Sequence, residues 1–88
     1  MKWNIEYSRD ADRFIDKQDI RAEVREQLEF FLRKMRGESI SVDVRKLKGE
    51  WKGYFRIRKG RLRVIFSVDF NDRVLYVERA DFRGKAYK

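Results

Sequence analysis

The chain has 88 residues, of which 43% are charged and 42% hydrophobic, and its formal net charge is +8. This length and balance predict one globular domain over residues 1–88, and the basic surplus predicts a polyanionic partner such as nucleic acid, an acidic protein or an anionic membrane surface. Cysteine and histidine are absent, which excludes a disulfide framework, thiolate chemistry and the commonest general base. Without an apolar run of membrane-spanning length or a signal peptide core, we expect a cytoplasmic protein with no membrane partner.

The N-terminal part of the sequence predicts a strand followed by two helices. Trp3, Ile5 and Tyr7 alternate with polar residues, which is typical of a half-buried strand. Ser8 is the expected N-cap of a short helix that continues to about Lys17. Asp19 is the expected N-cap of a longer helix that ends at Gly37. Its apolar stripe, which predicts core packing, consists of Ile20, Val24, Leu28, Phe31, Leu32 and Met35.

The remainder of the chain changes to a period of two and predicts four more strands. Their apolar positions are Val42 and Val44, then Phe55 and Ile57, then Leu62, Val64, Phe66 and Val68, then Leu75 and Val77. Turn signals separate them at Lys48-Gly49, Lys59-Gly60 and Asn71-Asp72. The order β-α-α-β-β-β-β predicts an α+β fold in which two helices cover one face of an antiparallel sheet.

The segment YFRIRKGRLRV, from Tyr54 to Val64, carries arginine at alternate positions on both sides of a glycine. A two-residue loop at Lys59-Gly60 would pair Arg58 with Arg61 and Arg56 with Arg63 on one face of the sheet. The apolar residues Phe55, Ile57, Leu62 and Val64 would lie on the other face. Like charges opposite each other cost up to ~1 kcal/mol per pair, so we expect an anionic compensation, to which Glu78 could contribute.

Two interpretations of these arginines remain open from the pattern alone. They are either solvated or paired with carboxylates, or they form a phosphate-binding surface, because the guanidinium fork matches phosphate geometry. Tyr54 and Phe82 could provide a stacking surface for a base, although Tyr54 fits core packing equally well. The carboxylates of the first helix, Asp10, Asp12 and Asp16, indicate capping or solvated charges rather than a metal site.

The C-terminal segment after the last predicted strand is basic and has no periodicity. Arg83, Lys85, Tyr87 and Lys88 either fray or return beside the arginine-rich hairpin. A P-loop, a dinucleotide-binding glycine motif and a zinc-protease motif are all absent from the sequence.

The order of elements, the segment VRKLKGEWKGYFRIRKGRLRVIFSV and the closing FRGKAYK resemble the RelE/ParE superfamily of bacterial and archaeal toxins. The resemblance covers nearly the whole chain and implies a RelE-like fold whose sheet is mixed at the N-terminal strand. It implies a metal-independent, cofactor-free endoribonuclease that cleaves messenger RNA in the ribosomal A site. It also implies a cognate acidic, RelB-like antitoxin, bound as a heterodimer or heterotetramer.

The resemblance further implies roles for individual residues. Arg63, Arg83 and Tyr87 match the catalytic positions of the family. The expected RNA-binding residues are Arg56, Arg58, Arg61, Lys48, Lys52 and Lys85, with Lys46 as a further candidate.

Cleavage by the neighbouring 2′-hydroxyl requires in-line geometry, a base, charge stabilisation on the phosphorane and an acid. We expect Arg63 and Arg83 to contact the transition-state phosphate and Arg56 and Arg58 to orient it. Arginine, with a pKa above ~12, is a poor base. Tyr87, with an unperturbed pKa of ~10, is the better candidate, and the identity of the base stays open.

Two alternatives use the same sequence features. One is a ParE-like gyrase-inhibiting toxin on the same fold, and the other is a non-catalytic module that binds RNA or an antitoxin. The arginine-rich hairpin and the tyrosine of the tail favour the ribonuclease.

Overall fold

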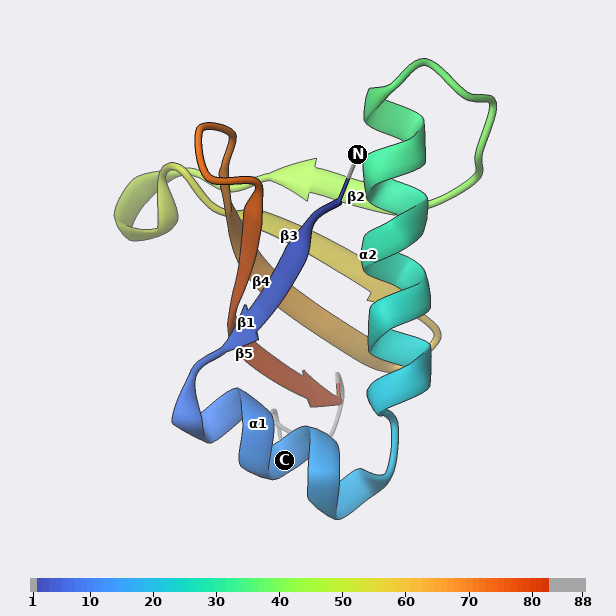
Figure 1. Ribbon diagram of the computed structural model, residues 1–88. Helices are drawn as coiled ribbons and strands as arrows, with labels where there is room; N and C mark the ends of the chain where they lie inside the picture. Colours follow the sequence, from blue (N-terminus) through green and yellow to red (C-terminus); the bar gives the residue numbers. More distant parts are fainter. Residues whose placement is uncertain (1, 83–88) are drawn as a thin grey trace.

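The computed structural model describes residues 2–82, which form two α-helices, one short 3-10 helix and five strands (Figure 1). In chain order these elements are β1 (Asn4–Tyr7), α1 (Arg9–Gln18), α2 (Arg21–Met35), β2 (Asp43–Lys46), η1 (Gly49–Trp51), β3 (Phe55–Lys59), β4 (Leu62–Asp69) and β5 (Val74–Phe82). The predicted order of helices and strands is confirmed, and only η1 was not anticipated.

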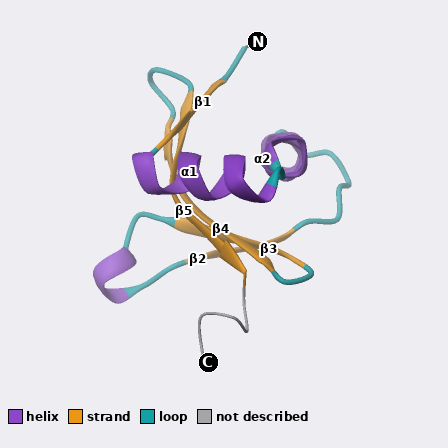
Figure 2. Ribbon diagram, turned by 90° about the horizontal axis from the view of Figure 1, so that it is seen from below, coloured by secondary structure: helices purple, strands orange, loops and turns teal. Residues whose placement is uncertain are grey.

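The five strands form one mixed sheet in the order β1-β5-β4-β3-β2. β1 runs parallel to β5, and the other neighbouring strands pair antiparallel. Both α-helices lie on one face of this sheet, and η1 lies on the side away from α2 (Figure 2). The predicted α+β fold, with a sheet mixed at its N-terminal strand, is therefore confirmed.

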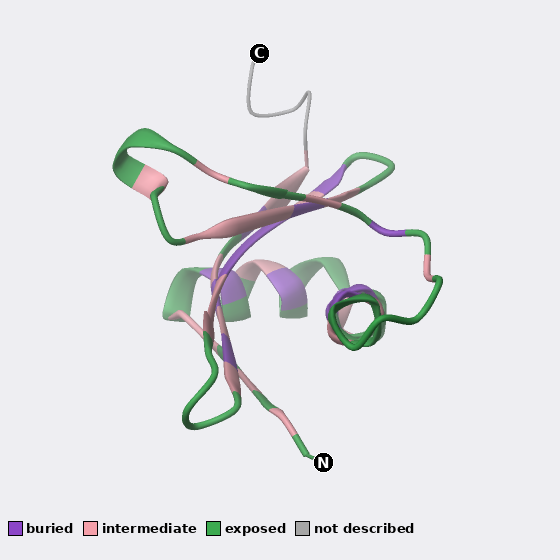
Figure 3. Ribbon diagram, turned by 90° about the horizontal axis from the view of Figure 1, so that it is seen from above, coloured by how far each residue is buried: buried purple, intermediate pink, exposed green. Residues whose placement is uncertain are grey.

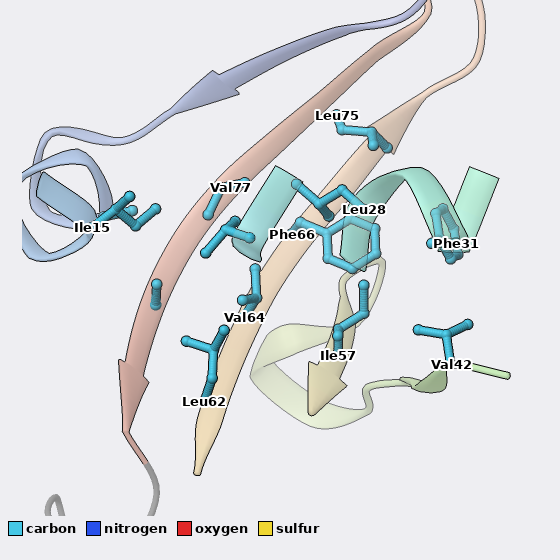
Figure 4. Packing of buried hydrophobic residues seen from close by; sticks show 13 residues of the cluster. Ile15, Leu28, Phe31, Val42, Ile57, Leu62, Val64, Phe66, Leu75 and Val77 are labelled. Carbon is cyan, nitrogen blue, oxygen red and sulfur yellow. The ribbon is translucent and has the colours of Figure 1, made fainter. Parts of the chain in front are cut away.

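The core fills the space between the helices and the sheet (Figure 4). Phe66 on β4 is fully buried, with its ring centroid 4.9 Å from that of Phe31 on α2 and 5.6 Å from that of Phe55 on β3. Buried residues gather along the central strands and on both helices, while most loop residues are exposed; Val42, just before β2, is a buried exception (Figure 3). Met35, at the end of the predicted apolar stripe, is 44% exposed, because α2 ends there beyond the edge of the core.

The start of α1 was predicted correctly. The Ser8 hydroxyl accepts a hydrogen bond from the Ala11 amide at 3.1 Å, and Ser8 precedes the first residue of α1. It also donates to the Glu78 carbonyl at 2.7 Å. One side chain therefore caps α1 and ties it to β5.

The predicted N-cap of the long helix was wrong. Asp19 ends α1 in the left-handed conformation, with φ of 56°, and Ile20 precedes α2 without a side-chain cap. Aspartate tolerates the left-handed region better than most residues, and the chain turns sharply between the two helices within these two residues (Figure 1). Among residues 2–82, no helix is long and apolar enough to cross a membrane.

Candidate nucleic-acid interface

The predicted register of the β3–β4 hairpin was wrong: the loop lies one residue further along the chain, so each residue of β3 faces a residue two positions later in β4 than predicted. The loop is Gly60-Arg61, so Arg58 lies opposite Arg63, and Arg56 lies opposite Ile65. The physical reason is the backbone of Gly60, which adopts φ of 58°. A tight hairpin favours positive φ at the first loop residue, and glycine adopts it without steric cost.

The shift leaves each residue on its predicted face, because both strands keep the same alternation. Ile57 and Val64 point into the core and are fully buried. The opposite surface of the sheet carries the charged side chains, and we call it the arginine face. It consists of Asp43 and Arg45 on β2, Arg56 and Arg58 on β3, Arg63 and Ile65 on β4, and Arg79 and Asp81 on β5.

Register arranges these residues in two rows across the four strands. The first row reads Asp43, Arg58, Arg63, Asp81, with the two cations between two carboxylates. The second row reads Arg45, Arg56, Ile65, Arg79 and contains no carboxylate. The two Arg–Arg contacts of the predicted hairpin are therefore replaced by one within the hairpin and one between Arg45 and Arg56.

Arg63 is held by a bidentate ion pair at the β5 end of the first row. Its Nε donates to Asp81 Oδ1 at 2.9 Å, and its Nη2 donates to Asp81 Oδ2 at 3.0 Å. The side chains are only 19% and 26% exposed. Fork-to-fork geometry of this kind fixes the orientation of the guanidinium plane.

Arg56 and Arg63 both form ion pairs on the arginine face, and Arg56 is the more deeply buried of the two. Its side chain is 12% exposed, and its Nη2 lies 3.5 Å from Asp43 Oδ1, whose own side chain is 54% exposed. Burial lowers the pKa of Arg56 below its ordinary value, and the charge of Arg58 lowers that pKa further.

Two donors on this surface have no acceptor among residues 2–82. The buried Nε groups of Arg56 and Arg58 have no hydrogen-bond acceptor among the described residues. A buried cationic N–H without an acceptor costs free energy. These two donors are suited to the oxygens of an anion, provided that the arginine side chains move to expose them.

The counter-charges differ from the one suggested by the sequence. Glu78 makes no ion pair among the described residues, whereas Asp43 and Asp81 contact the arginines. Asp81 stands two residues after Arg79 in the last strand, and this alternation was the one sequence signal that could have placed it on the same face.

The aromatic residues also depart from expectation. Phe82 packs against Phe14 on α1, with ring centroids 5.2 Å apart. The guanidinium of the exposed Arg61 lies over the Phe82 ring, 5.6 Å from its centroid. Tyr54 is half-buried and meets Trp51 edge-on at 5.1 Å. Sequence reasoning missed Trp51, whose ring lies 5.7 Å from the Arg79 guanidinium on the arginine face.

The predicted lysines gather at the β2–β3 connection rather than in the two rows. Lys46, Lys48 and Lys52 line an open pocket of about 510 Å³ together with Leu47, Gly49, Gly53, Tyr54 and Phe55. No carboxylate lines this pocket, so its cations add to the basic edge of the sheet. Arg83, Lys85 and Tyr87 lie outside the described residues.

Two of the three carboxylates of α1 serve as ion-pair partners. Asp12 and Asp16 accept hydrogen bonds from Arg21 Nη2 at 2.7 and 2.6 Å, and these bonds raise the pKa of Arg21 above its ordinary value. Among residues 2–82, no group of three carboxylates is arranged to hold a metal ion.

Neither a family model nor a curated protein sequence matches this chain. Solved structures do match it. A chain of the archaeal RelE–RelB complex from Pyrococcus horikoshii OT3 is 28% identical, with 97% of this chain and 99% of that chain covered and a TM-score of 0.63. A chain of the RelBE2 toxin–antitoxin complex from Mycobacterium tuberculosis is 22% identical, with 94% and 100% covered and a TM-score of 0.69.

A chain of the DinJ–YafQ complex from E. coli is 17% identical, with 99% of this chain and 100% of that chain covered and a TM-score of 0.59. These likenesses span almost the full length of both partners in each comparison. They confirm, at the level of the fold, the resemblance that the sequence motifs indicated.

Proposed function

We propose, on the premise that the chain has the fold of the RelE-like toxins, that it is the toxin of a toxin–antitoxin module. Its activity is metal-independent endonucleolytic cleavage of messenger RNA on the ribosome, and a cognate antitoxin inhibits it. The observation that carries this proposal is the pair of buried Nε donors of Arg56 and Arg58, which find no acceptor in the part of the chain that the structure describes. An RNA phosphate would provide those acceptors.

The layout of the arginine face supports a phosphate ligand over a hydrophobic or cationic one. Arg45, Arg56 and Arg79 share a row that contains no carboxylate, and the guanidinium groups tolerate desolvation better than ammonium groups do. The carboxylates Asp43 and Asp81 stand at the outer ends of the neighbouring row. Cations between these ends concentrate positive charge at the centre of the face.

The proposed reaction uses the RNA's own 2′-hydroxyl as the nucleophile: its oxygen forms a bond to the scissile phosphorus while the bond from phosphorus to the 5′-oxygen breaks. The products are a 2′,3′-cyclic phosphate and a 5′-hydroxyl, whose oxygen takes up a proton as it leaves. Arg56 and Arg58 orient the scissile phosphate, and Arg63, whose plane Asp81 fixes, stabilises the charge that develops on the phosphorane. The base that removes the 2′-hydroxyl proton is assigned to Tyr87, and Arg83 is assigned to the same phosphate, both on the strength of the family resemblance. The ribosome supplies the in-line geometry that the arginines alone do not enforce.

The proposed inhibitor is an acidic antitoxin segment that folds on the basic surface. The matched chains from P. horikoshii, M. tuberculosis and E. coli come from complexes with antitoxins. A chain with 23 basic and 15 acidic residues attracts such a segment, and its ordering on the arginine face would cover the phosphate-binding donors.

The test is primer extension on a message translated in a cell-free system. Cuts in phase with codons, abolished by Arg58→Ala and retained in Arg25→Ala on the exposed side of α2, are expected. Cuts in untranslated RNA of equal intensity would contradict the ribosome-dependent mechanism.

The same experiment separates the alternatives. An intact message together with gyrase inhibition would indicate a ParE-like toxin, and an intact message with active gyrase would indicate a binding module. Arg83→Ala and Tyr87→Phe should each relieve growth inhibition in folded protein, and full toxicity of both variants would overturn those two assignments.

A further inference from the structure

Trp51 lies on the arginine face although it belongs to the connection at the far side of the sheet. It ends η1, between β2 and β3, yet its ring lies 5.7 Å from the guanidinium of Arg79 on β5. In the sheet order, β4 separates β5 from β3. The connection therefore folds back over the sheet and brings an aromatic ring to the second row of the arginine face.

We infer that Trp51 and Arg79 form a stacking surface for one nucleobase of the RNA, next to the phosphate held by Arg56 and Arg58. This inference rests on the proposed function and adds a base-reading position to it. Tryptophan and arginine both offer flat surfaces to unpaired bases. Trp51 is only half-buried, so its ring remains accessible.

The spacing of the second row suits this arrangement. Arg79 and Arg56 lie on either side of Ile65 in register. Because neighbouring strands in a sheet are about 4.8 Å apart, the backbones of the two arginines are about 10 Å apart. Ile65 is 7% exposed and is not part of the main core cluster. It therefore provides an apolar floor between the stacking surface and the phosphate-binding donors.

The hollow beside Trp51 favours a base over a second phosphate. It has a volume of about 590 Å³ and is lined by Trp51 and Arg79 and, from β5 and the start of α1, by Ser8, Arg9, Asp10, Ala11, Glu78, Ala80 and Asp81. A cavity of this size accommodates a small planar group. The carboxylates repel a phosphate but accept hydrogen bonds from the amino groups of a base.

Tyr54 holds Trp51 in place through two contacts. Tyr54 meets the Trp51 ring edge-on, with an interplanar angle of 89°. Its amide donates to the Trp51 carbonyl at 3.0 Å. Both contacts fix the connection before RNA arrives, which reduces the ordering cost of binding.

The experiment compares a complete RNA with a set of abasic RNAs, and the wild-type protein with its variants. One probe is a short single-stranded oligoribonucleotide with every base present, and the other is a set of the same oligonucleotide with one abasic position each. Binding is measured by fluorescence anisotropy for wild type, Trp51→Leu, Trp51→Tyr and the control Trp3→Leu. Trp3 packs edge-on against Phe70 at the start of the sheet.

Trp51→Leu is expected to weaken binding of the complete RNA about tenfold. Binding of the RNA that is abasic at the stacked position should not change, and Trp51→Tyr should restore most of the loss. Trp3→Leu should bind as wild type. Equal losses for the complete RNA and for every abasic RNA, or no loss at all, would overturn the inference.

A second measurement keeps the native platform intact. In Trp3→Phe, Trp51 is the one remaining tryptophan, and stacking of a base should quench its fluorescence, whereas the matching abasic RNA should bind without quenching. One outcome would overturn the stacking surface alone: Arg58→Ala abolishes RNA binding, but RNA does not quench Trp51 fluorescence and Trp51→Leu binds RNA as tightly as wild type. If wild type binds no better than Arg58→Ala, the proposed function falls with it.

Discussion

Replacing Arg56 with methionine should stabilise the fold while it abolishes activity. The buried Nε without an acceptor costs about 1–3 kcal/mol in the native state. Arg45 lies opposite Arg56 in register, and such a like-charge pair costs up to about 1 kcal/mol. Methionine removes both penalties and keeps an unbranched apolar stem.

Two losses oppose this gain. The ion pair with Asp43 spans 3.5 Å and has one exposed partner, so its removal costs about 0–1 kcal/mol. Imperfect repacking of the new side chain costs a similar amount. The net expectation is a stabilisation of about 1 kcal/mol, which raises Tm by about 4–8 °C in a domain of this size.

The assay is thermal and urea unfolding of wild type, Arg56→Met and the control Arg25→Met. Arg25 is an exposed cation on α2, so its replacement should change stability by less than about 0.5 kcal/mol. Added salt should stabilise wild type more than Arg56→Met, because it screens the repulsion on the arginine face. A destabilised Arg56→Met would refute the reasoning that this face is held at a cost.

Three further outcomes test the local structure. Ser8→Ala should lower the free energy of unfolding, measured in urea, by about 1–2 kcal/mol, because the α1 cap and the hydrogen bond to the Glu78 carbonyl are lost together. Ser8→Thr keeps the hydroxyl and should therefore retain most of the wild-type stability. Gly60→Ala should cost about 1 kcal/mol through its positive φ alone, because no atom lies within 4 Å of an added Cβ; Gly60→Asn should cost less, and equal costs would contradict the turn assignment. Arg33 lowers the pKa of Glu38, with a smaller effect of Arg36, so Arg33→Ala should raise that pKa toward its ordinary value in an NMR titration. Because the folded-state pKa of Glu38 is lowered, the associated stability is present above the ordinary pKa and is lost as pH falls through the folded-state value.

The parts of the fold that follow from local periodicity were predictable. The apolar spacing around Leu28 predicts a helix, and the alternation around Val64 predicts a strand with one face in the core, as the structure has them. The hairpin register was not predictable from alternation alone, because shifting the loop by one residue at Gly60 keeps every side chain on its face. The role of Asp19 was not predictable for a similar reason. An aspartate between two helices can cap the second helix with its side chain or end the first helix in the left-handed conformation, and the sequence pattern fits both.

The candidate site was predictable only in part. Alternation placed Arg56, Arg58 and Arg63 on one face, but their counter-charges come from strands that are distant in sequence. Trp51 reaches Arg79 through the tertiary course of the β2–β3 connection. No periodic pattern encodes such a contact, so the stacking surface emerges only from the folded chain.

The most direct measurement of the central claim is the salt dependence of RNA binding. Each phosphate contact to single-stranded RNA contributes about 0.7 to the slope of log K against log salt concentration. Arg58→Ala should reduce the slope by about that amount, and Arg25→Ala should leave it unchanged. Equal slopes for wild type and Arg58→Ala would contradict the claim that the arginine face binds RNA phosphates.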